Sequence, residues 1–113
     1  MRPRRALLLL AALPLLAGCA KKPETPPEIY AAYCARCHGD EGEGKGDPKS
    51  LKLYPHLDLL VSPMVRRGDR ALVRDRIAKG YGPMPGFSRR LSPQEIESLV
   101  DFTLALPEKK AGD

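Results

Sequence analysis

The chain has 113 residues, of which 42% are apolar and 5% aromatic, and it contains no tryptophan. Its formal net charge of +5 falls to +2 once Arg2, Arg4 and Arg5, in a candidate export segment, are set aside. So small a charge argues against nucleic-acid binding. A domain of this length buries only about 60 to 65 per cent of the surface that its unfolded chain exposes, so that a bound cofactor, a metal or disulfides would help to stabilise its fold.

The first eighteen residues have the layout of a secretory signal peptide. Residues 1–5 are basic, and residues 6–17 form an apolar run interrupted only by Pro14. This run is too short for a transmembrane helix, which needs about 20 apolar residues. We therefore predict that residues 1–18 are removed from an exported protein.

The residues Leu16-Ala17-Gly18-Cys19 resemble the lipobox of bacterial lipoproteins. This resemblance implies that Cys19 is lipidated on sulfur and becomes the new N-terminus, anchoring the protein to a bacterial membrane that faces the periplasm or the cell exterior. Several acyl chains hold a domain at a membrane where one chain binds only marginally. Residues 19–27, rich in proline and charge, then form a tether. The alternative is an ordinary signal with a chance cysteine.

The pentapeptide Cys34-Ala35-Arg36-Cys37-His38 is a C-x-x-C-H motif, which is typical of c-type haem attachment. Two thiols about one helical turn apart can each form a thioether to the same porphyrin, and the adjacent imidazole then points toward the iron. Before the motif, Thr25, Pro26 and Glu28 provide a capping box for a short amphipathic helix.

Two other interpretations of the cysteine pair are a thioredoxin-like dithiol and half of a zinc site. The dithiol lacks the alternating strand and helix pattern of its fold. A closed zinc site needs four ligands, and the candidates beyond Cys34, Cys37 and His38 are His56 and carboxylates. The sequence favours haem over both.

The loop 39–48 contains Gly42, Gly44 and Gly46 but follows no strand, so we interpret it as a turn beside the haem rather than a phosphate-binding loop. The next segment carries apolar residues that we expect to line the pocket or join the core. These are Leu51, Leu53, Tyr54 and Leu57.

Two further helices flank a stiff loop. Asp69 is placed to cap a helix over 70–79, which Gly80 ends. Ser92, Pro93 and Glu95 form a second capping box, and Pro107 is expected to end the helix that follows. Residues 108–113 are then predicted to be a disordered tail.

The loop between these helices, 80–87, holds Met84 among prolines and glycines. Because the second axial residue of a haem decides between electron transfer and ligand chemistry, Met84 is the informative candidate. Met64 and His56 are the alternatives, and His56 would give a haem of lower reduction potential.

The order of motif, glycine-rich loop, helix, methionine loop and helix resembles the class I cytochrome c family, over 27–106. The resemblance implies an all-α fold of three to four short helices around one covalent haem c, in a domain we place at 28–107. It also implies that Cys34 and Cys37 attach the haem, that His38 is the proximal iron ligand and that Met84 is the distal one. In that family a proline carbonyl often supports the histidine, and Pro48 and Pro55 are both candidates. Phe87 and Leu99 are expected to pack near the macrocycle.

These features predict a single-electron carrier rather than an enzyme, with redox proteins as partners, acting as a monomer or as a subunit of a complex. The alternatives are a haem-bearing subunit of a larger oxidoreductase and, if Met84 is not a ligand, an open-site haem enzyme or a gas sensor. A basic stretch is a candidate docking surface, although a solvated helix face is the interpretation we favour. It comprises Arg66, Arg67, Arg70, Arg74, Arg76 and Lys79.

Overall fold

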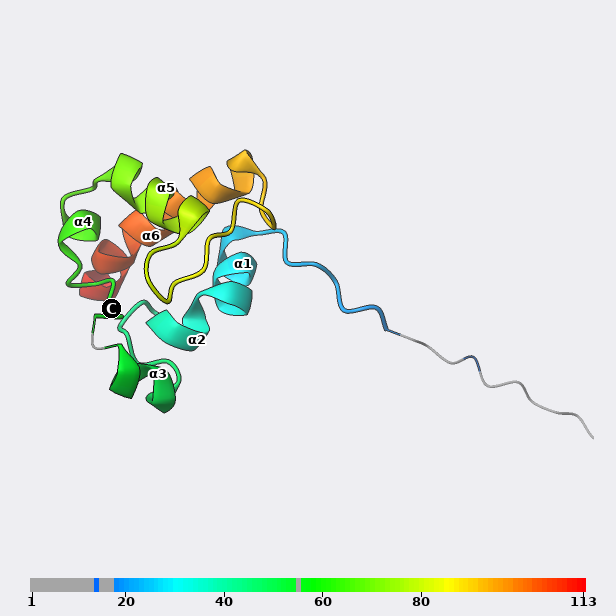
Figure 1. Cartoon of the computed structure of the whole chain (residues 1–113), viewed down its shortest axis with the longest axis horizontal. Helices are drawn as coiled ribbons and strands as arrows, with labels where there is room; N and C mark the ends of the chain where they lie inside the picture. The colour runs from blue at the N-terminus through cyan, green and yellow to red at the C-terminus, as the bar shows by residue number, and fades with distance from the viewer. Residues whose placement is uncertain (1–13, 15–17, 55) are drawn as a thin grey trace, which may run out of the picture.

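The computed structural model describes residues 14, 18–54 and 56–113. In that part of the chain the regular elements are six helices, and the β-type pairing is one isolated bridge between Tyr81 and Met84. The helices are α1 (Pro26–Tyr33), α2 (Ala35–His38), α3 (Pro48–Leu53), α4 (Pro63–Arg66), α5 (Arg70–Lys79) and α6 (Pro93–Gly112), as Figure 1 shows. The predicted all-α class is confirmed. The short helices α2, α3 and α4 bring the number above the predicted three to four.

The helix starts follow the capping signals of the sequence. Both predicted capping boxes are present, and in each the side-chain oxygen of the cap accepts from the backbone N–H of a glutamate, Thr25 from Glu28 and Ser92 from Glu95. The side chain of Asp69 accepts from the backbone N–H of Leu72 at 3.2 Å and so begins α5. These side chains satisfy amide groups that have no partner within the helix.

The end of α6 differs from the prediction. The helix continues through Pro107 to Gly112, so the expectation that Pro107 ends it is wrong, and residues 108–112 of the expected tail are helical. Tertiary contacts hold this last part, because Leu106 is buried over Gly42 and Lys110 Nζ lies 2.6 Å from the Glu41 carboxylate. These contacts offset the one backbone hydrogen bond that a proline removes.

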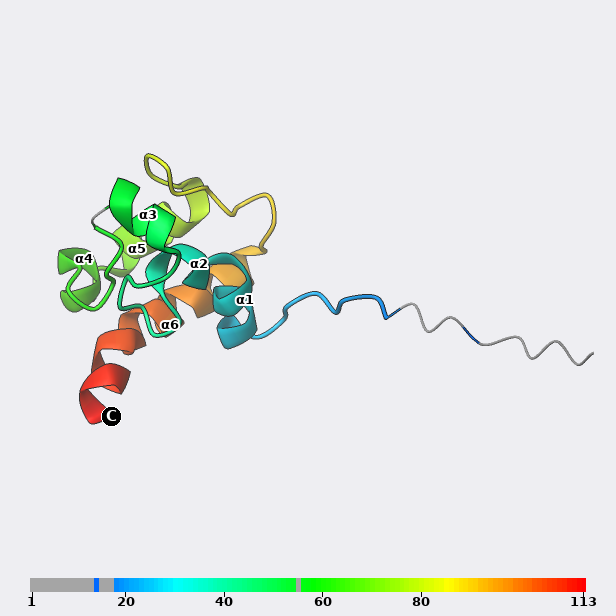
Figure 2. The ribbon, with the colours of Figure 1, turned by 90° about the horizontal axis from the view of Figure 1, so that it is seen from below.

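The core lies where α1 and α5 each pack on α6, with α4 against α5 and α6 at one end (Figure 2). Ile29 of α1 and Val100 of α6 are fully buried there, and Leu99 is 2% exposed. The rings of Tyr30 and Phe102 pack 5.0 Å apart between α1 and α6. Burial of these side chains supplies most of the stabilisation that the polypeptide generates itself.

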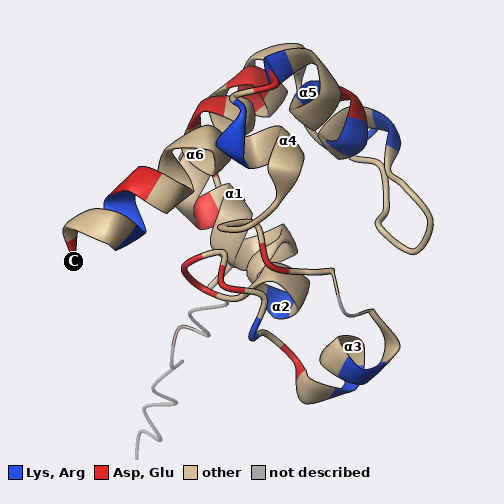
Figure 3. Ribbon diagram, turned by 90° about the vertical axis from the view of Figure 1, so that its left-hand side faces the viewer, with Lys and Arg blue, Asp and Glu red and all other residues tan. Residues whose placement is uncertain are grey.

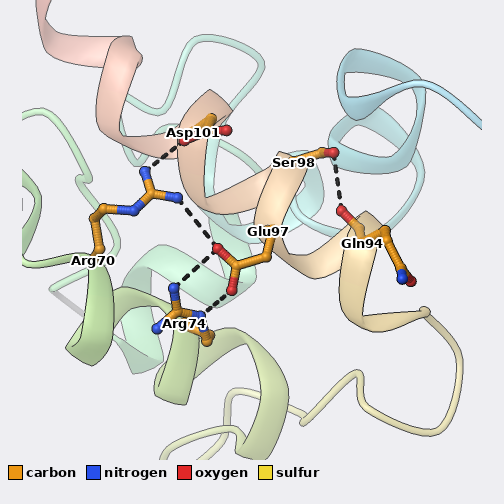
Figure 4. Close-up of polar contacts among 6 residues, drawn as sticks. All are labelled: Arg70, Arg74, Gln94, Glu97, Ser98 and Asp101. Carbon is orange, nitrogen blue, oxygen red and sulfur yellow. Dashed lines mark hydrogen bonds and ion pairs between the residues drawn. The ribbon is translucent and has the colours of Figure 1, made fainter.

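Most of the basic stretch is neutralised within the chain. Basic and acidic positions interleave along α5 and α6 (Figure 3), and the Glu97 carboxylate lies between the guanidinium groups of Arg70 and Arg74 (Figure 4). Arg70 also contacts Asp101 at 2.5 Å. The hydrogen bond from Arg74 lowers the pKa of Glu97. This geometry supports the solvated, ion-paired helix face rather than a free basic docking surface.

The capping box of α6 provides a stability test. Because the Ser92 hydroxyl is the acceptor for an orphan amide, Ser92→Ala should lower the free energy of unfolding by about 1 kcal/mol in a denaturant titration. Ser98→Ala is the matched control, since that hydroxyl only donates to the Gln94 carbonyl in the same helix, and it should change stability by less than about 0.5 kcal/mol. Equal effects of the two substitutions would contradict the capping role.

Candidate functional site

The C-x-x-C-H motif forms a tight helical turn directly after α1. Cys34 joins α1 to α2, and its carbonyl accepts from the amides of Cys37 at 3.1 Å and His38 at 3.0 Å. The two cysteines, three positions apart on one turn, therefore share a face. Both are partly buried and free of disulfides.

The imidazole of His38 is held by a backbone carbonyl. His38 Nδ1 lies 2.7 Å from the carbonyl oxygen of Leu57. A carbonyl only accepts hydrogen bonds, so Nδ1 must be the protonated nitrogen, and Nε2 keeps its lone pair for a metal. Of the two proline candidates, Pro48 does not supply the carbonyl, which comes from Leu57. The other candidate, Pro55, lies outside the described residues.

The glycine-rich loop brings Leu57 to the histidine. The amide of Gly44 donates to the His38 carbonyl at 2.7 Å, and the amide of Leu59 donates to the Gly42 carbonyl at 2.8 Å. A Cβ on Gly44, whose φ is +75°, would lie 2.7 Å from the backbone nitrogen of Asp58. Only a glycine allows this close approach without displacement, so the loop is a turn that packs against the motif. Its predicted position beside the haem stays a prediction.

The Met84 loop folds back on itself and on α5. Tyr81 and Met84 exchange two backbone hydrogen bonds of 3.0 Å each, with Gly82 and Pro83 at the turn. The amide of Phe87 then donates to the Ile77 carbonyl of α5 at 2.9 Å. Met84 is partly buried and packs against the core. The loop and α3 lie on the same side of the molecule in Figures 2 and 3.

The alternative axial residues have different surroundings. Met64 is also partly buried against the core, within α4, and its carbonyl accepts from the Asp69 amide at 2.9 Å. His56 is exposed. Burial therefore singles out the two methionines, and only Met84 stands in a doubly hydrogen-bonded loop outside the helices.

The alternatives to haem gain no support from the geometry. In the described part of the chain, no three His, Cys, Asp or Glu side chains gather into a metal site. Burial, followed by the neighbouring Cys37, raises the pKa of the Cys34 thiol to about 11. A redox-active dithiol instead has a lowered thiol pKa, so this pair is unlike a thioredoxin site.

Helix α3 lies beside Cys37, and exposed apolar side chains stand on it and at its end. Cys37 Sγ lies 3.8 Å from the Ser50 hydroxyl of α3, and α3 has no buried residue. Leu51, Leu53 and Tyr54 are 37%, 60% and 38% exposed, so these three are not core residues. A porphyrin is a large apolar plate that needs such a surface. Two thiols, an imidazole with a free Nε2, a thioether sulfur and these side chains together fit a covalent haem.

Two supporting residues were not predicted from the sequence. Leu57 acts through its backbone carbonyl, which no side-chain pattern reveals. The Tyr30 hydroxyl donates to the Gly39 carbonyl at 2.7 Å, immediately after His38. Burial raises the pKa of Tyr30, and the phenol therefore stays a donor. Phe87 and Leu99, expected near the macrocycle, are both buried in the core.

Comparison with known proteins gives a consistent picture. Residues 21–102 match the family model described as cytochrome c oxidase, cbb3-type, subunit III. The chain is 36% identical over 80 residues to the cbb3-type cytochrome c oxidase subunit FixP of Azorhizobium caulinodans, covering 70% of this chain and 25% of that protein. It is 34% identical over 83 residues to cytochrome c6 of Microcystis aeruginosa, covering 72% of this chain and 93% of that protein.

The chain spans a different share of the oxidase subunits than of cytochrome c6. It covers about a quarter of the oxidase subunits, including the FixPc protein of Rhizobium leguminosarum, to which it is 29% identical over 83 residues. The match to this larger kind of protein is thus a match to one part of it. Among the described residues, the helices are all too short or too polar to cross a membrane.

The close approach at Gly44 gives a test of the support for His38. Gly44→Ala should destabilise the protein by more than Gly68→Ala, measured as the free energy of unfolding. Both glycines have positive φ, +75° and +66°, so both substitutions carry the backbone strain, but a Cβ on Gly68 meets nothing within 4 Å. Equal losses of stability would show that the contact of Gly44 with Asp58 is unimportant.

Proposed function

This chain belongs to the cytochrome c family, and from that premise we propose that it carries single electrons at the extracytoplasmic face of a membrane. Haem c, covalently attached, is its cofactor, and c-type electron transfer is its activity. The all-α architecture agrees with this family. The observation that carries the proposal is the hydrogen bond from His38 Nδ1 to the Leu57 carbonyl, beside the two thiols of the motif.

We assign the site residues as follows. Cys34 and Cys37 would form the thioether links to the haem, His38 would bind the iron through Nε2, and Met84 would be the second protein ligand of the iron. This assignment is supported by the shared face of the two cysteines, by the fixed tautomer of His38 and by the defined turn that holds Met84.

The haem supplies a one-electron couple between ferric and ferrous iron. The residues of the chain position the two proposed iron ligands, so that no small molecule would bind the iron. Leu57 fixes the orientation of His38, and the bridge between Tyr81 and Met84 holds the thioether sulfur in a defined loop. His38 and Met84 would both hold the iron, so that the haem would supply electron transfer without binding a further ligand.

A second candidate is a haem-bearing subunit of a larger oxidoreductase. The match of 21–102 to the subunit III model favours it, whereas the coverage of 93% of a cytochrome c6 favours the carrier. Both proteins would transfer electrons with the same site. Gentle solubilisation of membranes and purification through a tag separates them, because a subunit brings stoichiometric partner chains and a carrier does not.

We also propose that the protein is a lipoprotein with a signal peptide at 1–18 and a lipidated Cys19. Cys19 is exposed, and residues 18–24 form no helix and extend away from α1 (Figure 1). Lys22 Nζ lies 3.8 Å from the Glu95 carboxylate at the start of α6. The end of the tether that leads into α1 therefore lies close to the domain. The domain would thereby be held near membrane-bound partners.

The axial ligand is tested by replacing each partly buried methionine in turn. Met84→Ala should abolish the weak near-infrared absorption band of sulfur-ligated ferric haem and lower the reduction potential, because methionine ligation raises the potential. Met64→Ala is the matched control, and its spectrum should keep the band. Loss of the band in the Met64 variant alone would assign the ligand to α4 and contradict our proposal.

The anchor is tested with Cys19→Ser in a cell that exports the protein. The wild-type chain should incorporate labelled fatty acid and sediment with membranes, whereas the variant should do neither, because a thioether to lipid requires the thiol. The haem spectrum should be the same in both, since Cys19 is remote from the C-x-x-C-H motif in the sequence. Unchanged membrane association and labelling of the variant would refute the lipoprotein assignment.

A further inference from the structure

One cation of α5 lacks the acidic partner that the others on this helix have. The ion pairs are Arg70–Glu97, Arg70–Asp101, Arg74–Glu97 and Lys79–Asp75. Within the described residues Arg76 forms no ion pair, and its Nε is buried without a hydrogen-bond partner. Arg76 is thus a partly buried guanidinium whose charge the described chain leaves uncompensated.

Arg76 lies directly beside the loop of the proposed distal ligand. Its guanidinium carbon is 3.7 Å from the centroid of the Tyr81 ring, and its carbonyl accepts from the Gly80 amide at 2.9 Å. Tyr81 in turn exchanges both backbone hydrogen bonds with Met84. A stacked guanidinium is restricted in orientation, so Tyr81 fixes the plane of Arg76 next to the Met84 loop.

A buried donor without a partner costs free energy, and for a charged group the cost is larger. The ligand that best compensates a planar guanidinium is a carboxylate, which binds it through two parallel hydrogen bonds. The haem that this family binds carries two propionate carboxylates. A bound haem would therefore supply a carboxylate, the kind of hydrogen-bond acceptor that Arg76 lacks.

We infer that Arg76 binds a propionate of the haem, with Tyr81 holding the guanidinium in place. This inference rests on the proposed function, in which Met84 binds the iron. It makes Arg76 a positioning residue that links the haem carboxylate to the Met84 loop. Its positive charge also favours the ferrous state and so raises the reduction potential.

The test compares holoprotein variants by resonance Raman spectroscopy and by potentiometric titration. The propionate bending bands report hydrogen bonding at the carboxylates, and the near-infrared band reports that Met84 is still bound. Arg76→Gln should shift a propionate band and lower the reduction potential. Arg76→Lys keeps the charge but not the planar fork, so it should shift the band with a smaller change in potential.

Two further variants separate this role from a general charge effect. Tyr81→Leu removes only the stacking ring and should shift the same propionate band by a smaller amount than Arg76→Gln. Arg70→Gln removes the same charge from the same helix, where Arg70 already has Glu97 and Asp101 as partners, and should leave the bands unchanged.

The inference would be overturned if the propionate bands stayed as in the wild type in all three variants, Arg76→Gln, Arg76→Lys and Tyr81→Leu, while the iron–methionine band was intact. That result would leave the proposed function standing. If one of the three variants does not bind haem, the other two still test the contact between Arg76 and the propionate. A wild-type holoprotein without the iron–methionine band would overturn the proposed function and this inference with it.

Discussion

The hydrogen bond between His38 Nδ1 and the Leu57 carbonyl is the contact on which the rest of the site depends. It fixes the tautomer of the imidazole and leaves Nε2 free for iron. The glycine-rich loop places Leu57 there, because it packs against the motif and against the backbone around Asp58 at Gly44. The glycine-rich segment therefore supports the proposed iron site through its backbone, and none of its residues is proposed as an iron ligand.

The core formed by α1, α5 and α6 and the region around α3 are stabilised in different ways. The helices α1, α5 and α6 pack around fully buried residues such as Ile29 and Val100, and capping boxes define where α1 and α6 begin. Helix α3 instead buries none of its residues and leaves Leu53 60% exposed. We expect the haem to order this second region, because a ligand that binds only the folded state stabilises it.

The sequence predicted those features that depend on local chemistry. Capping side chains specified the starts of α1, α5 and α6, and Gly80 specified the end of α5, because these signals act over three or four residues. The end of α6 was missed, since it depends on contacts of Leu106 and Lys110 with a distant loop. The Leu57 carbonyl was missed for a different reason, because a backbone carbonyl carries no side-chain signal in the sequence. The family resemblance supplied the expected roles of His38 and Met84 as iron ligands, which periodicity alone does not give.

The central claim is a haem iron bound by His38 and Met84 in both oxidation states. Iron-edge X-ray absorption of the purified holoprotein, recorded oxidised and then reduced, measures it most directly. We predict one sulfur and five nitrogen ligands in each state, with little change in their distances, as a single-electron carrier requires. An iron without a sulfur ligand, or one that loses a ligand on reduction, would contradict the closed site and favour ligand-binding chemistry.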